Sequence, residues 1–243
     1  MTLLRSLLFG VFFYGGIVVL GTLYLPLLIL PRKVGMPFFL FFVDYSMACM
    51  RLLTGMTYRV HMADGASLPE GAAIYAAKHQ SAWETIAFNR VIPGAVFVLK
   101  RELLRVPFFG WYLWKAGHIA VNRSAGASAM RAMVSAGKEV IDRGGNIVIY
   151  PQGTRVAPGV DAPYHPGVFA LYKALNLPVV PVALDSGRLW RRNGIIKRAG
   201  VVTVSILPTI EPGLDRKTFM ERLESSIEAE VMRLDRSNDA GPR

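Results

Sequence analysis

The sequence has little cysteine and little negative charge, and both shortages exclude classes of protein. Its 243 residues contain one cysteine, Cys49, so no disulfide can form within the chain and a cysteine-ligated metal site is disfavoured. Such a chain can fold in a reducing compartment. Its 17 acidic residues stand against 28 lysines and arginines, which gives a net charge of +11. This balance favours an anionic partner, which can be nucleic acid, a membrane surface or a substrate.

Motifs for nucleic-acid binding are also lacking. The chain has no aromatic-basic RNA motif and no zinc-finger spacing, so nucleic acid is the least favoured of those partners. Hydrophobic residues make up 52% of the sequence, and the excess is concentrated at the N-terminus. The length suits one ordinary domain with an appendage.

Two long apolar stretches begin the chain. Residues 3–30 are almost wholly apolar and long enough to span a bilayer as a helix. A signal peptide is the alternative, because Arg5 precedes the apolar run, but the run is too long and lacks an Ala-x-Ala-like cleavage site. The second stretch, residues 36–53, contains Asp44 and Arg51 and is a poorer spanning candidate.

The short segment 31–35 joins these two stretches. A helical hairpin dipping into one leaflet fits the pattern as well as one span plus an interfacial helix. If the first stretch spans, Arg32 and Lys33 favour a cytoplasmic location for its C-terminal end. We therefore expect a membrane-associated helical segment at 1–55, followed by a globular domain at 56–243 on the cytoplasmic face of the inner membrane.

Strands and helices alternate along the globular part. Apolar runs bounded by turn residues predict strands at 58–62, 72–77, 95–99, 118–121, 146–150, 179–184 and 201–206. Helical periodicity predicts helices at 85–88, 107–115, 130–141, 168–175 and 219–234, the last with Asp215 as its N-cap. The last residues, 237–243, are expected to fray. Such alternation predicts an α/β fold with a mixed, largely parallel sheet flanked by helices and preceded by the hydrophobic helical hairpin.

Three loops share one property, because each begins where an apolar strand is expected to end. They carry His79, Lys100 and Arg155. In open α/β sheets, ligands bind in the crevice outside the carboxyl ends of the strands. If these strands are parallel neighbours, His79, the nearby Glu84 and the two cations converge. This set of groups can remove a proton from a hydroxyl and hold an anion close to it.

Each of these features has a simpler interpretation. Ser81 and Glu84 fit a Ser-x-x-Glu capping box, in which the carboxylate bonds backbone and does no chemistry. Lys100 alone is a solvated charge, and Gly153 alone needs only a turn. The other histidines are expected to be structural or exposed: His61, His118 and His165. A further basic run is most simply a solvated face, and second a lipid-headgroup contact: Arg188, Arg191, Arg192, Lys197 and Arg198.

Four blocks occur in one order along residues 56–213. They are His79–Glu84, Lys100–Leu103 with Pro107 and Gly110, Pro151–Arg155, and Val180–Leu184. In this order they resemble the lysophosphatidic acid acyltransferases of the PlsC type, also called 1-acylglycerol-3-phosphate acyltransferases. Members carry a His-x4-Asp motif, so Glu84 is a departure that adds one methylene. Gln152 is a second departure, because members usually have Glu there.

The resemblance implies a glycerolipid acyltransferase-like fold and a role for each block. His79 is then the base that takes the proton of a lipid hydroxyl, and Glu84 orients its ring. The residues implied to bind the acceptor phosphate are Lys100, Gly153, Thr154 and Arg155, with Arg105 and Gln152 as two further candidates for substrate contact. Acyl-CoA or acyl-carrier protein is implied as co-substrate, with no metal and no cofactor.

The implied activity is transfer of a fatty acyl group from a thioester to lysophosphatidic acid, forming phosphatidic acid in phospholipid synthesis. Two alternatives stay open at this point. The acceptor can be another molecule, glycerol 3-phosphate or a lyso-aminolipid, or the chain can be a lipid-binding membrane protein without catalysis. One aromatic cluster is either the wall of an acyl groove or ordinary core: Phe108, Phe109, Trp111, Tyr112 and Trp114.

Overall fold

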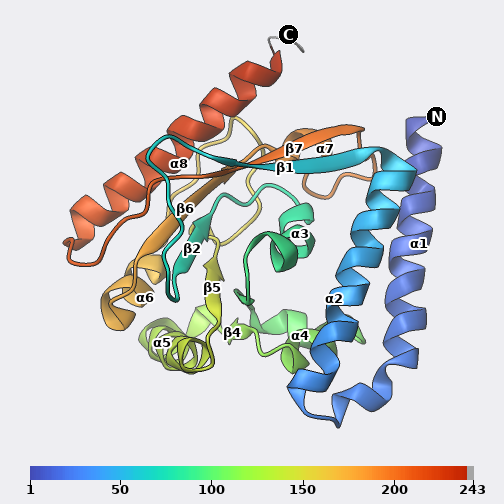
Figure 1. Cartoon of the computed structure of the whole chain (residues 1–243), viewed down its shortest axis with the longest axis horizontal. Helices are drawn as coiled ribbons and strands as arrows, with labels where there is room; N and C mark the ends of the chain where they lie inside the picture. The colour runs from blue at the N-terminus through green and yellow to red at the C-terminus, as the bar shows by residue number, and fades with distance from the viewer. Residues whose placement is uncertain (240–243) are drawn as a thin grey trace.

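A single seven-stranded sheet forms the centre of the computed structural model, which describes residues 1–239. The strand order is β1-β7-β6-β2-β5-β3-β4 (Figure 1). Neighbouring strands are parallel throughout, except for the antiparallel pair β6 and β7. The strands are β1 Met56–Met62, β2 Ile74–Ala77, β3 Ala95–Lys100, β4 Ile119–Val121, β5 Asn146–Ile149, β6 Val179–Leu184 and β7 Gly200–Ile206. The predicted mixed, largely parallel sheet is confirmed.

The helices of the globular part follow the predicted order. They are α3 Trp83–Val91, α4 Phe109–Lys115, α5 Gly126–Asp142, α6 Gly167–Leu175, α7 Ser186–Leu189 and α8 Arg216–Asp239, with 3-10 turns η3 Arg101–Arg105 and η4 Arg123–Ala125. The short α7 was not predicted, because four residues are too few to show a helical period. Helix α8 is regular through Asp239, so fraying from residue 237 is wrong for 237–239. The remainder of that prediction, residues 240–243, lies outside the described residues.

Asp215 caps α8 as predicted. Its Oδ1 accepts hydrogen bonds from the N–H groups of Lys217 at 2.9 Å and Thr218 at 3.1 Å. The Thr218 hydroxyl donates to Oδ2. These bonds, chiefly those from Thr218, hold the pKa of the Asp215 carboxyl below its ordinary value.

Two hydrophobic cores lie on opposite faces of the sheet. Along β2, Tyr75 and Ala77 pack into the core that includes α3 and the N-terminal helices. Ile74 and Ala76 face the other way, into the core shared with α5, α6 and α8. Figure 1 shows these two groups of helices on either side of the sheet. Burial on both faces explains why the central strands read as continuous apolar runs without alternation.

The N-terminus forms an antiparallel helical hairpin (Figure 1). It consists of α1 Thr2–Leu23, the 3-10 turn η1 Leu25–Leu28, α2 Arg32–Cys49 and the π-helical turn η2 Met50–Thr54. The turn between the helices was expected at 31–35 and instead precedes residue 32. The reason is that Pro31 stands at the N-cap of α2, so Arg32 and Lys33 already belong to its first turn.

The hairpin packs on the globular part at both ends of α1. Near its start, the Ser6 hydroxyl accepts a hydrogen bond from the N–H of Lys197 at 2.9 Å. Near its end, the Tyr112 hydroxyl donates to the carbonyl of Gly21 at 2.7 Å. Helix α2 is fixed in the same way, because its Asp44 accepts from Arg90 of α3 at 2.7 Å. Asp44, one of the two charges that make residues 36–53 a poorer spanning candidate, is therefore paired with Arg90 of the globular part.

Candidate active site

The loops singled out in the sequence leave one edge of the sheet. Strands β6, β2, β5, β3 and β4 are consecutive in the sheet and parallel, so their carboxyl ends meet at that edge. His79 and Arg155 lie in the loops after β2 and β5, and Lys100 is the last residue of β3. The condition for convergence, that these strands are parallel neighbours, is met.

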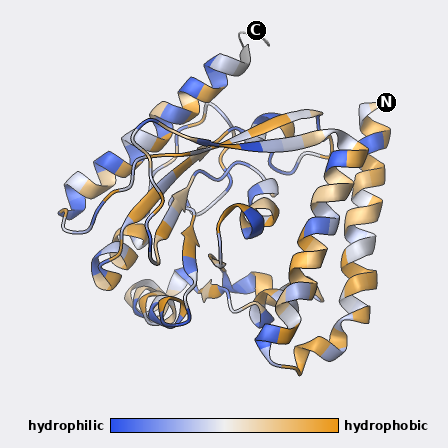
Figure 2. Ribbon diagram, viewed as in Figure 1, coloured by the Kyte–Doolittle hydropathy of each residue, from blue (hydrophilic) through white to orange (hydrophobic). Residues whose placement is uncertain are grey.

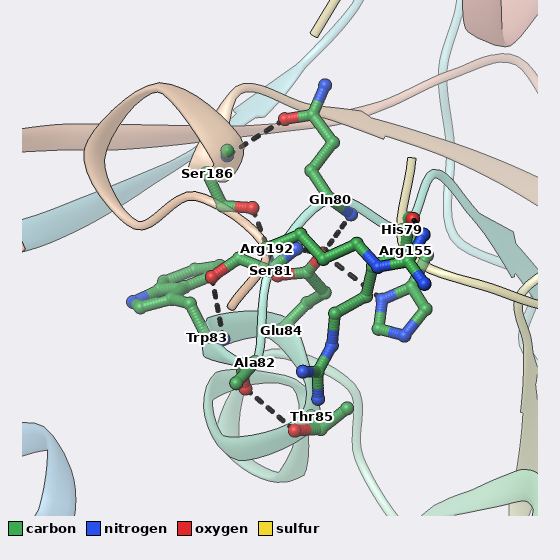
Figure 3. A network of polar contacts seen from close by, with 11 residues as sticks. His79, Gln80, Ser81, Ala82, Trp83, Glu84, Thr85, Arg155, Ser186 and Arg192 are labelled. Carbon is green, nitrogen blue, oxygen red and sulfur yellow. Dashed lines mark hydrogen bonds and ion pairs between the residues drawn. The ribbon is translucent and has the colours of Figure 1, made fainter. Parts of the chain in front are cut away.

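His79 and Glu84 form a pair in the turn between β2 and α3. The Nδ1 atom of His79 lies 3.3 Å from Oε1 of Glu84 (Figure 3). The Glu84 side chain is fully buried, whereas 12% of the His79 side chain is exposed. Within residues 1–239 nothing bonds the second ring nitrogen, Nε2. With its Nδ1–H directed at the carboxylate, the ring presents Nε2 as a free acceptor.

Glu84 also bonds the backbone, as the capping interpretation requires. Its Oε1 accepts from the N–H groups of Gln80 at 2.5 Å and Ser81 at 2.7 Å. Its Oε2 accepts from the Ser186 hydroxyl at 3.0 Å. The Ser81 hydroxyl accepts from the N–H of Trp83, so it serves the helix start (Figure 3). One carboxylate therefore holds both the turn and the ring, and the two interpretations describe one arrangement.

Tyr150 lies flat against the His79 ring. The ring centroids are 3.9 Å apart and the planes differ by 13°. The Tyr150 hydroxyl is buried and has no hydrogen-bond partner among the described residues. Burial, with the charge of Glu84 as a second cause, raises the pKa of this phenol well above its ordinary value. With the carboxylate at its edge and a neutral aromatic ring on its face, the imidazole has one fixed orientation.

Sequence reasoning missed Tyr150, because it reads as the last apolar residue of a strand. Its place at the end of β5, directly before the loop 151–155, was the available signal.

The loop after β5 closes through Gly153. This residue has φ +65°, which favours glycine, and its N–H donates to the Tyr150 carbonyl at 2.9 Å. A Cβ here would lie 3.1 Å from the His165 ring and 3.2 Å from Nη1 of Arg123. The turn interpretation of Gly153 is confirmed.

Arg123 belongs to this site and was not predicted. Its guanidinium donates to the carbonyl of Gly153, and burial lowers the pKa of Arg123. The residue lies just after β4, so the rule that selected the other loops, a charge directly after an apolar strand, would have found it. It brings a cation from a fourth strand to the same edge.

Arg155 lies beside His79. The N–H of Val156 donates to the His79 carbonyl at 2.8 Å, which joins the two loops. Arg192 donates through Nη1 to the Arg155 carbonyl at 2.9 Å. Figure 3 shows Arg155 and Arg192 close to His79. Thr154, in the same loop, is exposed.

Three predicted site residues are not drawn into these contacts. Lys100 and Arg105 are exposed, and their side chains make no hydrogen bond or ion pair with any described residue. Gln152 is buried and donates through Nε2 to the carbonyl of Ala162 at 3.4 Å, so it faces the following loop. Gly110 has a packing role, because a Cβ there would overlap the carbonyl oxygens of η3.

The other three histidines are structural or exposed, as predicted. His61 is exposed on β1, and His165 is exposed beside Gly153. His118 is partly buried, and its Nδ1 accepts from the N–H of Phe97 at 3.1 Å. Burial, with a smaller contribution from two arginines, lowers the pKa of His118 to about 3, so it stays neutral.

Lys78 directly precedes His79 in the chain and is anchored to α8. This lysine is buried, and its ammonium bonds both carboxylate oxygens of Glu228 at 2.7 Å. The Tyr164 hydroxyl donates to the same carboxylate at 2.8 Å. The strand end that presents His79 is thereby tied to the C-terminal helix.

The predicted aromatic cluster divides into two groups. Phe108, Phe109 and Tyr112 line an apolar cavity of about 80 Å³ between α1, α2 and α4. Trp111 and Trp114 are 40% and 64% exposed. Neither a pure groove wall nor a pure core describes the cluster.

The arrangement as a whole favours proton transfer next to an anion site. Within the described part of the chain, no three His, Cys, Asp or Glu side chains gather in a way that would hold a metal ion. Ser81 is occupied by the helix start and is not placed as a nucleophile. What remains is an oriented imidazole with a free nitrogen, and cations from neighbouring loops.

Comparison with known proteins gives consistent results. Residues 59–185 match the family described as Acyltransferase. Over 181 residues the chain is 34% identical to a 1-acyl-sn-glycerol-3-phosphate acyltransferase of Pseudomonas aeruginosa, covering 74% of this chain and 70% of that protein. A Cocos nucifera protein of the same name is 28% identical over 61% of this chain, and the match spans about half of its length (49%).

The fold has a solved counterpart. The crystal structure of the 1-acyl-sn-glycerophosphate (LPA) acyltransferase PlsC from Thermotoga maritima superposes with a TM-score of 0.70. The match covers 96% of each chain at 20% sequence identity. This likeness confirms the predicted fold, including the helical hairpin before the sheet.

Proposed function

This chain belongs to the acyltransferase family, and we propose that it transfers a fatty acyl group from a thioester to the free hydroxyl of lysophosphatidic acid. The product is phosphatidic acid, an intermediate of phospholipid synthesis. The names of the relatives in Pseudomonas aeruginosa and Cocos nucifera support this acceptor. The proposal takes residues 56–213 as the acyltransferase unit, within a catalytic domain at 56–243 and after a membrane-associated segment at 1–55.

One observation carries the proposal. His79 presents a free Nε2 while its Nδ1 faces a buried carboxylate, at a sheet edge that also holds the guanidinium groups of Arg123 and Arg155. A base at an edge that also holds two guanidinium groups suits a substrate that carries a hydroxyl and a phosphate. Glycerol 3-phosphate and lyso-aminolipids are alternative acceptors. The aminolipids offer less negative charge for Arg123 and Arg155 to bind.

The reaction follows from the positions of these groups. Nε2 of His79 takes the proton of the acceptor hydroxyl while its oxygen attacks the thioester carbonyl carbon. Glu84 holds the ring and compensates the charge of the imidazolium. The carbon–sulfur bond then breaks, and the imidazolium returns its proton to the departing thiolate. No covalent acyl-enzyme forms, because the activated hydroxyl attacks directly.

The phosphate of the acceptor is assigned to the loop after β5. Arg155 supplies a fork of donors suited to phosphate, and Arg123 adds a second guanidinium. Gly153 and Thr154 let the backbone and a hydroxyl approach the ligand. The N–H of Gly153 is already bonded, so it is not available for the thioester oxyanion. Lys100 and Arg105 lie further out, where they suit attraction of the anionic lipid more than direct contact.

An acceptor panel tests the function. The purified full chain in detergent is given labelled acyl-CoA or acyl-carrier protein, with lysophosphatidic acid, glycerol 3-phosphate or a lyso-aminolipid. We expect labelled phosphatidic acid with at least one donor and far less product from the other acceptors. Equal or greater transfer to another acceptor would replace lysophosphatidic acid in the proposal, and lipid binding without transfer would favour the non-catalytic alternative.

Removing the Arg155 guanidinium tests the phosphate assignment. Arg155→Ala is expected to raise the KM for lysophosphatidic acid by about 10-fold to 100-fold, since hydrogen bonds to charged groups contribute about 1.5–3 kcal/mol. The change in kcat should be smaller, because the guanidinium binds a remote group. Steady-state kinetics with a fixed, saturating acyl donor measures both constants.

Arg131→Ala is the matched control for that variant. Arg131 is an exposed arginine on α5, and its loss removes the same charge from outside the site. An Arg155→Ala enzyme with the KM and kcat of Arg131→Ala would reject the phosphate assignment.

The hairpin is proposed to lie flat in one leaflet. Both of its helices are long and apolar enough to cross a membrane by length and composition. Exposed apolar side chains follow α1 along its whole length: Leu4 63%, Val11 68%, Val19 64% and Leu23 67%. Figure 2 shows the largely hydrophobic colouring of the hairpin helices. Yet α1 is tied to the globular part near both of its ends. If α1 spanned the bilayer, its contacts with Lys197 and Tyr112 would require parts of the globular domain on both sides of the membrane. The packing therefore supports a monotopic hairpin.

The exposed Trp111 and Trp114 suit the interface beside the hairpin, where tryptophan is favoured. Phe108, Phe109 and Tyr112 remain the proposed wall for the acyl chain.

Cysteine labelling tests the hairpin topology. In a Cys49→Ser background, Thr2→Cys marks the start of α1, and Lys33→Cys marks the first turn of α2, beyond the end of α1. Both should react with a membrane-impermeant maleimide from the cytoplasmic side, as should Ser225→Cys on α8 as the positive control. Labelling of positions 2 and 33 from opposite sides of the inner membrane would establish that α1 spans it instead.

A further inference from the structure

A second group of cations lies on the segment that follows β6, next to the loop that carries Arg155. In the sheet, β6 borders β2 on one side, and β5, β3 and β4 follow on the other. Arg155 and Arg123 come from the loops after β5 and β4. The segment after β6, residues 188–198, is here called the arginine loop. Its exposed cations are Arg191, Arg192 and Arg198.

The arginine loop is a fixed structure, held from both ends. Trp190 and Lys197 form an antiparallel bridge, and the N–H of Arg198 donates to the Leu189 carbonyl at 2.9 Å. The buried ammonium of Lys197 lies over the Trp190 ring, 5.0 Å from its centroid. The loop therefore presents its tip, residues 191–196, in one position.

The loop is also joined to the base. It follows α7, whose Ser186 bonds Glu84 at 3.0 Å and whose Gly187 N–H bonds the Gln80 side chain at 3.0 Å. Arg192 reaches the Arg155 carbonyl (Figure 3). Its cations are thus held at a set place relative to His79.

Surface ion pairing does not account for these arginines. Residues 186–199 contain no acidic side chain, and Arg191 and Arg198 form no ion pair with any residue of the described range 1–239. Between them, Ile195 and Ile196 are 62% and 46% exposed. A loop that displays unpaired cations around an apolar pair is suited to a ligand with both an anionic group and a less polar arm.

We infer that the arginine loop binds the phosphate at the far end of the acyl donor's pantetheine arm. This inference rests on the proposed function. Acyl-CoA and acyl-carrier protein share that chemistry, because in both the thioester is carried on a pantetheine arm that ends in phosphate. The acceptor phosphate is assigned to Arg155 and Arg123. Arg191 and Arg198 are exposed cations outside that set, so they are left for the anion of the donor, which must place its thioester at the same base.

Separate cation groups have a mechanistic reason. Both substrates are anionic, and a single site would make them compete instead of reacting. With separate arginines for each anion, the acceptor and the donor can be bound at His79 at the same time. The arginine loop then determines donor affinity, and the loop after β5 determines acceptor affinity.

The test is a paired removal of charge. Arg191→Gln with Arg198→Gln is expected to raise the KM for the acyl donor about tenfold, since exposed ionic contacts contribute up to about 1 kcal/mol each. The KM for lysophosphatidic acid and kcat should stay near wild type. Arg192 is left intact because it also bonds the acceptor loop. Lys217→Gln with Arg222→Gln, two exposed cations of α8, removes the same charge elsewhere and should change none of these constants.

The two donors and a vesicle assay separate the outcomes. A raised KM with acyl-CoA, alone or together with acyl-carrier protein, supports the inference. A rise confined to acyl-carrier protein would overturn phosphate binding, because acyl-CoA carries phosphate too. An unchanged donor KM also overturns it. Loss of binding to phosphatidylglycerol vesicles, with the donor KM unchanged, would assign the loop to lipid headgroups.

Calorimetry with CoA alone keeps this test independent of turnover. The wild-type chain and the Lys217→Gln, Arg222→Gln control should bind CoA several-fold more tightly than the arginine-loop variant. Equal binding by all three would overturn the inference even if acyl transfer is shown. A protein that binds CoA through this loop but transfers no acyl group would refute the proposed function and leave the loop's role intact.

Discussion

Replacing His79 with alanine is expected to lower kcat for acyl transfer by a factor of about 100 to 10,000, the usual contribution of a positioned general base. Nε2 of His79 is free and its Nδ1 faces Glu84, whereas no other histidine within residues 1–239 forms a hydrogen bond or ion pair with a carboxylate. No other histidine there is oriented in this way, so none is expected to take over the proton transfer. The KM values should change less, because the cations that bind the substrates remain.

The fold should survive this substitution. The His79 ring packs on Tyr150 and bonds Glu84, but the turn itself is held by the backbone bonds from Gln80 and Ser81 to that carboxylate. Circular dichroism and thermal unfolding in detergent check the fold, while steady-state assays measure kcat.

His61→Ala is the matched control, since His61 is exposed on β1 and outside the site. If His79→Ala keeps more than about a tenth of the wild-type kcat, far above the loss expected for a general base, another group is the base and the mechanism is wrong.

Glu84→Gln is expected to lower kcat about 100-fold or more while leaving stability almost unchanged. The amide oxygen can still accept from the backbone N–H groups of Gln80 and Ser81, and the amide nitrogen can donate to the Ser186 hydroxyl. The cap is therefore retained. What is lost is the negative charge beside the imidazolium that forms when His79 takes the proton.

Glu84→Asp completes this comparison. It keeps the charge, and Asp is the residue that the family motif usually has. Its shorter side chain cannot reach the ring and the backbone in the same way, so we expect a loss of kcat smaller than that of Glu84→Gln. Wild-type turnover in Glu84→Gln would remove the orienting role and leave only the cap. A matching fall in the unfolding temperature and in kcat would show that the turn, and not the charge, is what matters.

Several features of this protein were determined by local sequence alone. Strand positions were predictable because central strands buried on both faces must be continuously apolar, as residues 74–77 and 179–184 are. Helix α5 was predictable from its 3.6-residue period, and Asp215 from cap chemistry. His79 and Arg155 were found because a polar residue directly after a buried strand must lie at the sheet edge.

Other features depended on contacts between residues far apart in the chain. Tyr150 reads as strand, and only the pairing of β2 with β5 places its ring on His79. Ser186 bonds Glu84 across 102 positions of sequence, and no local pattern specifies such a contact. Arg123 was missed because the strand before it, β4, has only three residues and gives a weak pattern. Its contact with the carbonyl of Gly153 is seen only in the fold.

His79 and Glu84 show most clearly what the sequence determined and what the tertiary structure added. The sequence by itself determined that a histidine and a carboxylate share one turn at a strand end, because their spacing and the flanking strand and helix are local. It left a helix cap and a catalytic pair as rival explanations of Glu84. Only the tertiary structure showed that the cap and the contact with the His79 ring occur together, since burial under α7 brings the backbone, the ring and Ser186 onto one carboxylate.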